Sequence, residues 1–132
     1  MVYEEIAFLV GRVLIGGFLA FNGANHFLKR ENMAGYAESK GAPAPSVTVP
    51  LTGLMLLAGG FSILLGAYTT AGIALVALFF LAVTPVMHDF WSVPDDQKQQ
   101  EMTNFMKNMA ILGAVLTLLM VQNWPYALNI GL

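Results

Sequence analysis

The sequence predicts an all-α fold, an integral membrane four-helix bundle whose four transmembrane helices run up, down, up and down. Of the 132 residues, 57% are hydrophobic and only 11% are charged, whereas a soluble domain carries about 25% charged residues. Four apolar runs are long enough to cross about 30 Å of hydrocarbon. Backbone polar groups in lipid must pair within their own segment, which favours helices. The length leaves no room for a second domain, so we expect one domain over residues 1–132.

The predicted spans cover about residues 6–28, 47–66, 70–90 and 105–121. After the first span, Gly41, Pro43 and Pro45 stop any helix, because proline lacks the backbone donor that a helix needs. We expect a short interfacial helix near residues 33–39. Residues 67–70 form so short a connection that the second and third spans must be antiparallel neighbours.

The first span carries a seam of small and polar residues. At about 100° per residue, five side chains fall within about 40° of one line along the helix. These are Arg12, Gly16, Leu19, Gly23 and His26. Small residues on a seam let a second backbone approach closely, and polar residues on it need partners there. We therefore expect this face to pack against another helix.

Arg12 lies inside the first span, where a buried guanidinium requires acceptors. The candidate acceptors are Glu4, Glu5, the carbonyls of the turn at residues 69–70, Gln122 and Tyr126. The alternative is a side chain that snorkels outward to the head groups. In either case we assign Arg12 a structural role.

Polar residues of several spans are expected at one membrane level. Spans one and three run in the same direction, His26 and His88 lie near their ends, and the fourth span begins on that side. The candidate ligand-binding residues are Asn22, Asn25, His26, His88, Asp89, Lys107 and Asn108. Polar groups within spans are costly and often functional. The alternatives are that these residues meet lipid head groups, or that Lys107 snorkels or pairs with Asp89.

Several kinds of chemistry are excluded or disfavoured by composition. The chain has no cysteine, which excludes disulfides, thiolate catalysis and iron–sulfur clusters held by this chain alone. A net charge of −2 and the lack of a basic face argue against nucleic acid as a partner. His26 and His88 are the two residues able to ligate haem, but they lie near the interface beside charged residues, so we expect neither haem nor a metal.

The chain is expected to be a multi-pass protein of the cell membrane. The N-terminal residues lack the basic segment and cleavage site of a signal peptide, so the first span is expected to be retained. Five basic residues lie in or beside the first and third loops: Lys29, Arg30, Lys40, Lys98 and Lys107. Because cytoplasmic loops carry the excess of lysine and arginine, we expect these two loops inside the cell and both termini outside.

Five segments occur in an informative order: GRVLIGGFLAFNGANHF, GYAESKGAPAP, LAGGFSILLGAYT, PVMHDFW and NFMKNMAILGAVL. This order, over nearly the whole chain, resembles the DoxX/DoxD-like family of small four-span membrane proteins. The resemblance implies a four-helix membrane bundle, and some relatives form the membrane subunit of a thiosulfate:quinone oxidoreductase. If that redox role applies, Arg12, His26, His88 and the pair Lys107–Asn108 are the positions that carry it. Many members have an acidic residue before the paired glycines of the second span, where this chain is apolar from Leu56 to Ala58.

The function that these observations favour is a quinone-interacting membrane subunit, associated with a redox system that acts on a sulfur compound or another substrate. A quinone head group needs a few polar contacts in an apolar pocket. The sequence holds no self-sufficient catalytic motif, so the chain is at most a membrane subunit of a quinone-linked oxidoreductase and needs a redox partner protein or a bound cofactor. The main alternative is a non-enzymatic scaffold or partner-binding protein, in which Gly16, Gly23, Gly59 and Gly60 form homo-oligomer contacts. A small-solute carrier is a third, less favoured function.

Overall fold

The computed structural model describes residues 2–131. Within this range the chain forms α1 (Val2–Leu28), α2 (Arg30–Ser39), α3 (Pro45–Leu65), α4 (Thr69–Met87), α5 (Asp95–Thr117) and the 3-10 helix η1 (Leu118–Met120). The helices α1, α3 and α4, and α5 continued through η1, are long and apolar enough to cross a membrane. The predicted membrane fold of four apolar helices is thus confirmed, and α2 is the short helix expected after the first span.

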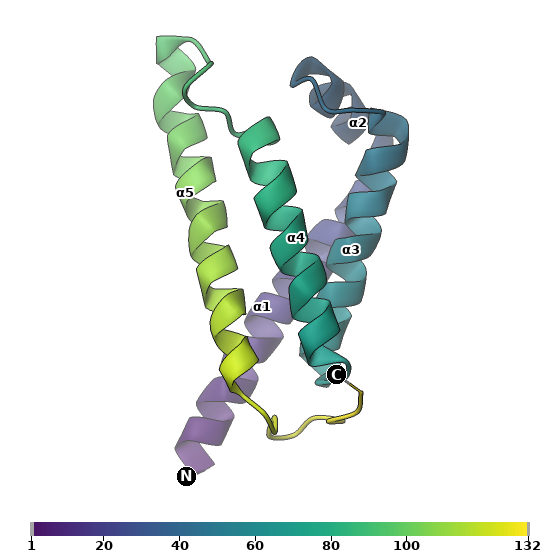
Figure 1. The fold of residues 1–132 in the computed structure, drawn as a ribbon, viewed down its shortest axis with the longest axis vertical. Helices are drawn as coiled ribbons and strands as arrows, with labels where there is room; N and C mark the ends of the chain where they lie inside the picture. Colours follow the sequence, from purple (N-terminus) through teal and green to yellow (C-terminus); the bar gives the residue numbers. More distant parts are fainter. Residues whose placement is uncertain (1, 132) are drawn as a thin grey trace.

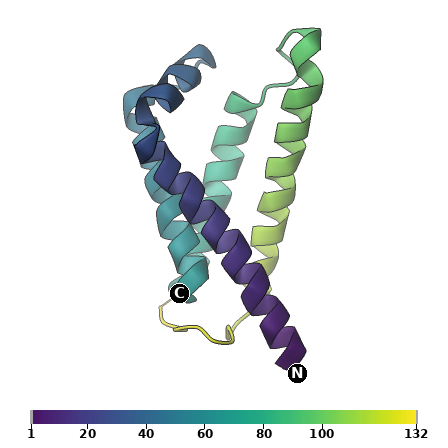
Figure 2. The same ribbon diagram turned by 180° about the vertical axis from the view of Figure 1, so that it is seen from behind.

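The four long helices leave one side of the molecule open. Figure 1 shows α5, α4 and α3 side by side, while α1 crosses behind them at a steep angle. Seen from behind in Figure 2, α1 and α5 lie apart at the end where α1 meets α2. The loop before α5 and the helix α2 stand at this end, and the C-terminal tail runs beneath the opposite end.

Two helices differ in extent from the membrane spans expected from sequence. The fourth span was expected from residue 105, yet α5 begins ten residues earlier, at Asp95. Its first two turns are polar, so hydropathy marks only the part able to lie in lipid, while Asp95 and Asp96 in the first turn suit the positive end of the helix dipole. The third span was expected to reach residue 90, but α4 ends at Met87 and leaves His88 and Asp89 in the following loop.

The helices α1 and α3 pack so closely that their backbones are in contact. The predicted seam is confirmed, because the buried residues of α1 include all five of its members: Arg12, Gly16, Leu19, Gly23 and His26. A Cβ atom on Gly16 would lie 2.9 Å from the carbonyl oxygen of Gly60, and one on Gly23 would lie 2.7 Å from that of Gly53. These contacts lie within the chain, which corrects the expectation that Gly16, Gly23 and Gly60 mediate an oligomer.

Gly59, the fourth glycine of that expectation, faces α4. A Cβ atom there would lie 2.9 Å from the carbonyl oxygen of Gly72. The paired glycines of α3 thus serve two different helices, with Gly60 turned towards α1 and Gly59 towards α4.

The tail after η1 completes the end of the molecule where α3 and α4 meet. Leu128 and Asn129 donate backbone hydrogen bonds to the carbonyls of Leu65 and Gly66, at 2.9 and 2.7 Å. The last carbonyls of a helix have no partner within it, so the tail supplies the missing donors to α3. In return, Ile130 accepts a 2.7 Å bond from the amide of Tyr68.

Arg12 ties α1 to this tail. Its two terminal nitrogens donate 2.7 Å hydrogen bonds to the carbonyls of Pro125 and Tyr126. Only 3% of Arg12 is exposed, so the outward-snorkelling alternative was wrong, and Tyr126 is confirmed as one of the expected acceptors through its backbone oxygen. The tail also places Trp124 in the core beside these bonds.

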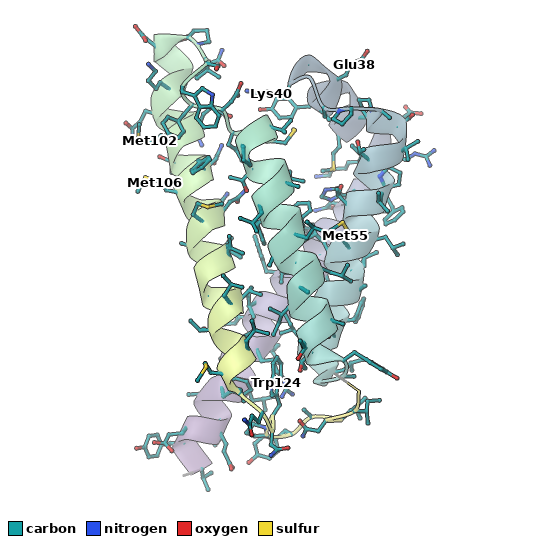
Figure 3. The ribbon with its side chains drawn as sticks, in the orientation of Figure 1. Glu38, Lys40, Met55, Met102, Met106 and Trp124 are labelled. Carbon is teal, nitrogen blue, oxygen red and sulfur yellow. The ribbon has the colours of Figure 1, made fainter. Side chains whose placement is uncertain are left out.

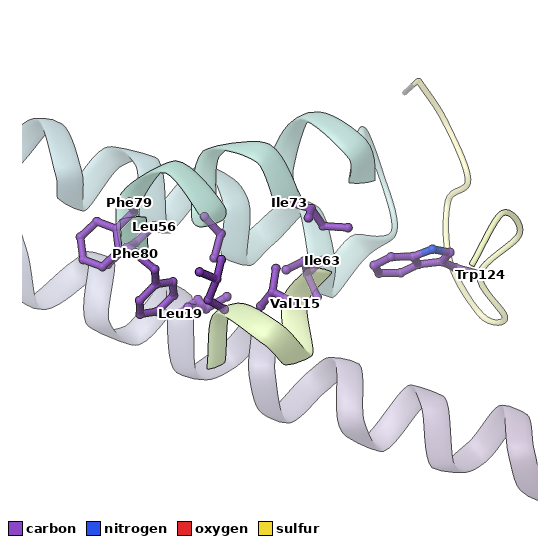
Figure 4. Packing of buried hydrophobic residues seen from close by; sticks show 10 residues of the cluster. Leu19, Leu56, Ile63, Ile73, Phe79, Phe80, Val115 and Trp124 are labelled. Atoms are coloured by element: carbon purple, nitrogen blue, oxygen red, sulfur yellow. The ribbon is translucent and has the colours of Figure 1, made fainter. Parts of the chain in front are cut away.

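The core runs along the inner faces of α1, α3, α4 and α5 (Figure 4). Its members are Leu19, Leu56, Ile63, Ile73, Val76, Phe79, Phe80, Leu112, Val115 and Trp124. Trp124 meets the edge of the Phe8 ring at a centroid distance of 5.3 Å. One aromatic side chain from the tail therefore closes the core at its lower end.

We expect Gly60→Ala to destabilise the fold, because the added methyl would lie 2.6 Å from the backbone nitrogen of Ala20. Overpacking of this kind costs about 1–3 kcal/mol. Thermal unfolding in detergent should show a lower midpoint for this variant. Gly17→Ala is the matched control, since a Cβ atom there meets nothing within 4 Å. Equal midpoints for the two variants would contradict the close α1–α3 contact.

We expect Arg12→Leu to release the tail, because two charge-assisted hydrogen bonds are lost, each contributing about 1.5–3 kcal/mol. Limited digestion with chymotrypsin should then cleave after Tyr126 several times faster than in the unmodified protein. Arg30→Leu, at an exposed position of α2, is the control. An unchanged digestion rate in Arg12→Leu would show that the tail is held without the guanidinium.

Candidate functional site: a cleft between α1 and α5

The candidate site is a cleft of about 710 Å³ on the open side of the molecule, here called the α1–α5 cleft. All five α-helices contribute to its wall, and most of the lining is apolar. The residues used below are Phe18, Asn22, His26, Lys29, Thr52, Leu56, Phe79, Phe80, Val83, His88, Lys107 and Asn108. Such a cleft, mostly apolar with a few convergent polar groups, is typical of sites that bind small amphiphilic molecules.

On the α1 side, the polar groups of the cleft are held by the helix itself. Asn22 donates its amide hydrogen to the carbonyl of Phe18 at 2.8 Å. The Nδ1 atom of His26 lies 2.7 Å from the carbonyl of Asn22. Because a carbonyl can only accept, Nδ1 carries the proton in this bond and the Nε2 atom of a neutral ring is an acceptor.

His26 is fixed in this orientation by its surroundings. It is 8% exposed, its ring meets the edge of the Phe79 ring at 6.0 Å, and its Cβ atom lies against Gly53 of α3. Among residues 2–131, no side chain or carbonyl forms a hydrogen bond with Nε2. The free Nε2 atom and the Asn22 amide oxygen are therefore the hydrogen-bond acceptors that α1 offers to a ligand.

On the opposite side, α4 and α5 hold Asn108 in place. Its amide nitrogen lies 3.3 Å from the hydroxyl of Thr84, which is fully buried. Thr52 of α3 also reaches the cleft, but its hydroxyl donates to the carbonyl of Thr48 at 2.7 Å. Lys107, the residue before Asn108 on α5, also lines the cleft and is exposed. The amide oxygen of Asn108 thus remains a further acceptor.

The structure brings most of the predicted site residues together. Asn22, His26, His88, Lys107 and Asn108 line the cleft. Asn25 and Asp89 do not. Asn25 is turned away on the helix face next to His26, and Asp89 stands in the loop after α4, where it is drawn towards Lys40.

Lys40 and Glu101 were missed by the sequence reasoning, and they organise an ion cluster beside the cleft. Figure 3 shows Lys40 at the end of the molecule that carries α2. The Lys40 ammonium lies 3.0 Å from Asp89 and 3.6 Å from Glu101. Glu101 also lies 3.3 Å from the Nδ1 atom of His88. The expected pairing of Lys107 with Asp89 was therefore wrong, because Lys40, at the end of α2, occupies the position beside Asp89. One signal in the sequence could have identified Glu101: it is a carboxylate at a core-facing position in the early turns of α5.

The ion cluster shifts the pKa values of Lys40 and Asp89. Burial by itself would lower the pKa of Lys40, but the hydrogen bond to Asp89 and the nearby carboxylate charges outweigh it, so the pKa is raised. The hydrogen bond from Lys40 lowers the pKa of Asp89. Both groups are therefore charged at neutral pH, and they join the loop after α2 to the end of α4.

Metal binding finds no ready-made site in the described residues. Within residues 2–131 no three histidine or acidic side chains stand close enough to hold an ion. The carboxylate of Asp89, next to His88, is paired with Lys40.

Comparison with known proteins places these features in a family. The DoxX family model matches residues 7–89 of the chain, which include nearly all of α1 and the whole of α2, α3 and α4. The chain belongs to the DoxX family. Its cleft therefore combines helices of the DoxX match with α5, which lies outside the matched region.

The chain is also similar to inner membrane protein YphA of Escherichia coli (strain K12). The two are 26% identical over 115 residues, which cover 87% of this chain and 82% of YphA. This relative supports a membrane location for the DoxX protein described here. No solved structure matches the chain significantly.

We expect Lys40→Met to lower the thermal midpoint in detergent by about 5 °C at pH 7, because the buried Glu101 loses a cation. The lowered pKa of Asp89 makes its contribution present above about pH 4 and lost as the pH falls further. The raised pKa of Lys40 makes its contribution present below about pH 10 and lost at higher pH. The difference between the two proteins should thus be largest between about pH 5 and pH 9 and should shrink at about pH 3.

Lys98→Met is the control for this experiment. Lys98 pairs with Asp95 at 3.7 Å on an exposed surface, where an ion pair contributes little. A pH-independent effect of Lys40→Met, or an equal effect of Lys98→Met, would contradict the assigned pairing.

Proposed function

We propose that this protein is a quinone-interacting membrane subunit of a redox system, and that the α1–α5 cleft receives the head group of the reduced quinone. The observation that carries the proposal is a set of hydrogen-bond acceptors in the cleft that have no donor within the described residues 2–131. Asn22, His26 and Asn108 each direct a side-chain N–H to a group of the protein, which leaves the His26 Nε2 atom and the two amide oxygens as acceptors for a ligand in the cleft. A hydroquinone presents two hydroxyl donors, so it complements these acceptors better than the oxidised ring does.

The apolar lining supports the same assignment. Leu56, Phe79 and Phe80 line the cleft beside His26, and an aromatic head group packs favourably against such side chains. The cleft lies on the open side of the molecule between two membrane helices. A long isoprenoid tail can therefore remain in the bilayer while the head group enters.

His26 is the residue suited to accept a proton from the bound hydroquinone. Oxidation of a hydroquinone to the quinone releases two protons and two electrons. In the proposal, the Nε2 atom of neutral His26 accepts one hydroxyl proton, which makes the ring an imidazolium with both nitrogens protonated. The electrons pass to a redox partner protein, and the second proton leaves with solvent at the polar end of the cleft.

We also propose the membrane orientation expected from sequence. Lys29, Arg30, Lys40 and Lys98 lie at the end that carries α2 and the loop before α5. The excess of basic residues favours the cytoplasmic side for this end. Both chain termini are then on the outer side of the cell membrane.

We expect purified protein to bind decylubiquinol more tightly than decylubiquinone, in an equilibrium titration at fixed detergent concentration. His26→Phe keeps a ring beside Phe79 but removes the acceptor, and Asn108→Leu removes the second one. Each should weaken hydroquinone binding by about tenfold, the size of one or two lost hydrogen bonds.

Asn25→Leu is the matched control for the hydroquinone titration, because Asn25 lies next to His26 on α1 but does not line the cleft. It should leave the affinity within about twofold. If the unmodified protein binds neither form of the quinone, or if Asn25→Leu acts like His26→Phe, the cleft is not a quinone site. A scaffold or partner-binding role would then be the better description.

A further inference from the structure

The α1–α5 cleft carries positive charge that the protein does not neutralise. Lys29 and Lys107 line it, and no carboxylate does. Among residues 2–131, neither lysine has an acidic partner within ion-pair distance, whereas Lys40 and Lys98 do. Asp89 and Glu101, the carboxylates of the ion cluster beside the cleft, are already engaged with Lys40 and His88.

The two unpaired lysines stand on opposite sides of the cleft at a similar depth. Lys29 follows His26 by one helical turn, and His26 contacts Phe79 of α4. Lys107 precedes Asn108, which contacts Thr84 one to two turns further along α4. Both residues therefore lie beyond His26 along their elements, towards the end of the cleft nearest α2.

The rest of the cleft suits hydrocarbon. Phe18, Phe80 and Val83 line it, and the neighbouring outer face of α1 exposes Leu14 and Phe21 at 69% and 66%. In a bilayer these two residues face lipid, so a lipid chain can enter the cleft sideways between α1 and α5. A binding site with a cationic end and an apolar body is complementary to an anionic amphiphile.

We propose that the α1–α5 cleft binds one anionic phospholipid, with its phosphate at Lys29 and Lys107 and an acyl chain along Phe18, Phe80 and Val83. Lysines near a membrane surface attract anionic lipid, and here two of them are held on one cleft without a protein countercharge. The lipid site shares Phe80 with the proposed quinone site, but it does not depend on the quinone function, because its charged contacts are Lys29 and Lys107 and include neither His26 nor Asn22.

The test is native mass spectrometry of the full chain in detergent, with phosphatidylglycerol or phosphatidylcholine of identical acyl chains added in increasing amounts. We expect one phosphatidylglycerol to bind at least tenfold more tightly than phosphatidylcholine. Lys29→Gln and Lys107→Gln should each weaken it about fivefold, which corresponds to the attraction of one lysine for anionic lipid. The double variant should lose the preference for phosphatidylglycerol altogether.

Lys98→Gln is the matched control, because Lys98 lies at the same end of the molecule but pairs with Asp95 and does not line the cleft. It should bind phosphatidylglycerol as the unmodified protein does. Equal binding of the two lipids, or an equal loss in Lys98→Gln, would overturn the proposal. Inorganic phosphate at millimolar concentration should not displace the lipid, and displacement would overturn it in favour of a free anion.

The His26→Phe variant separates this site from the quinone site. We expect it to keep the phosphatidylglycerol preference while losing hydroquinone affinity. Loss of the lipid preference in His26→Phe would contradict two neighbouring sites.

Discussion

The close backbone contact between α1 and α3 is the constraint on which the rest of the structure depends. Gly16 meets Gly60 and Gly23 meets Gly53 with no room for a side chain, so α1 is fixed to α3 along much of its length. A helix held in this way cannot also follow α5, and the two lie apart at the α2 end (Figure 2). The α1–α5 cleft therefore exists because α1 packs against α3 and not against α5.

Both ends of the molecule are tied by polar contacts that hold this arrangement. At one end, Arg12 connects α1 to the tail, and the tail in turn supplies donors to the final carbonyls of α3. At the other end, Lys40 connects the loop after α2 to Asp89 and Glu101. Because these contacts lie above and below the cleft, its ends are fixed while its side stays open to lipid.

The distribution of charge then decides what kind of molecule the cleft suits. The ion cluster engages the nearby carboxylates, so the cleft wall retains lysines and hydrogen-bond acceptors but no acidic group. Intrahelical bonds engage the donors of Asn22 and His26. A head group with hydroxyl donors fits near His26, and a phosphate fits near Lys29 and Lys107. These are complementary chemical demands at adjacent positions of one membrane-facing cleft.

The sequence by itself determined the number of spans and the buried seam of α1, because hydropathy and the 3.6-residue helical period depend only on neighbouring residues. That His26, His88 and Asn108 line one cleft also followed from helix direction. The partners of the charged residues were decided by the tertiary structure alone. Lys40 reaches Asp89 across 49 positions, and Arg12 reaches Pro125 across 113. Such pairings depend on the paths of the loop after α2 and of the tail, which no local pattern specifies.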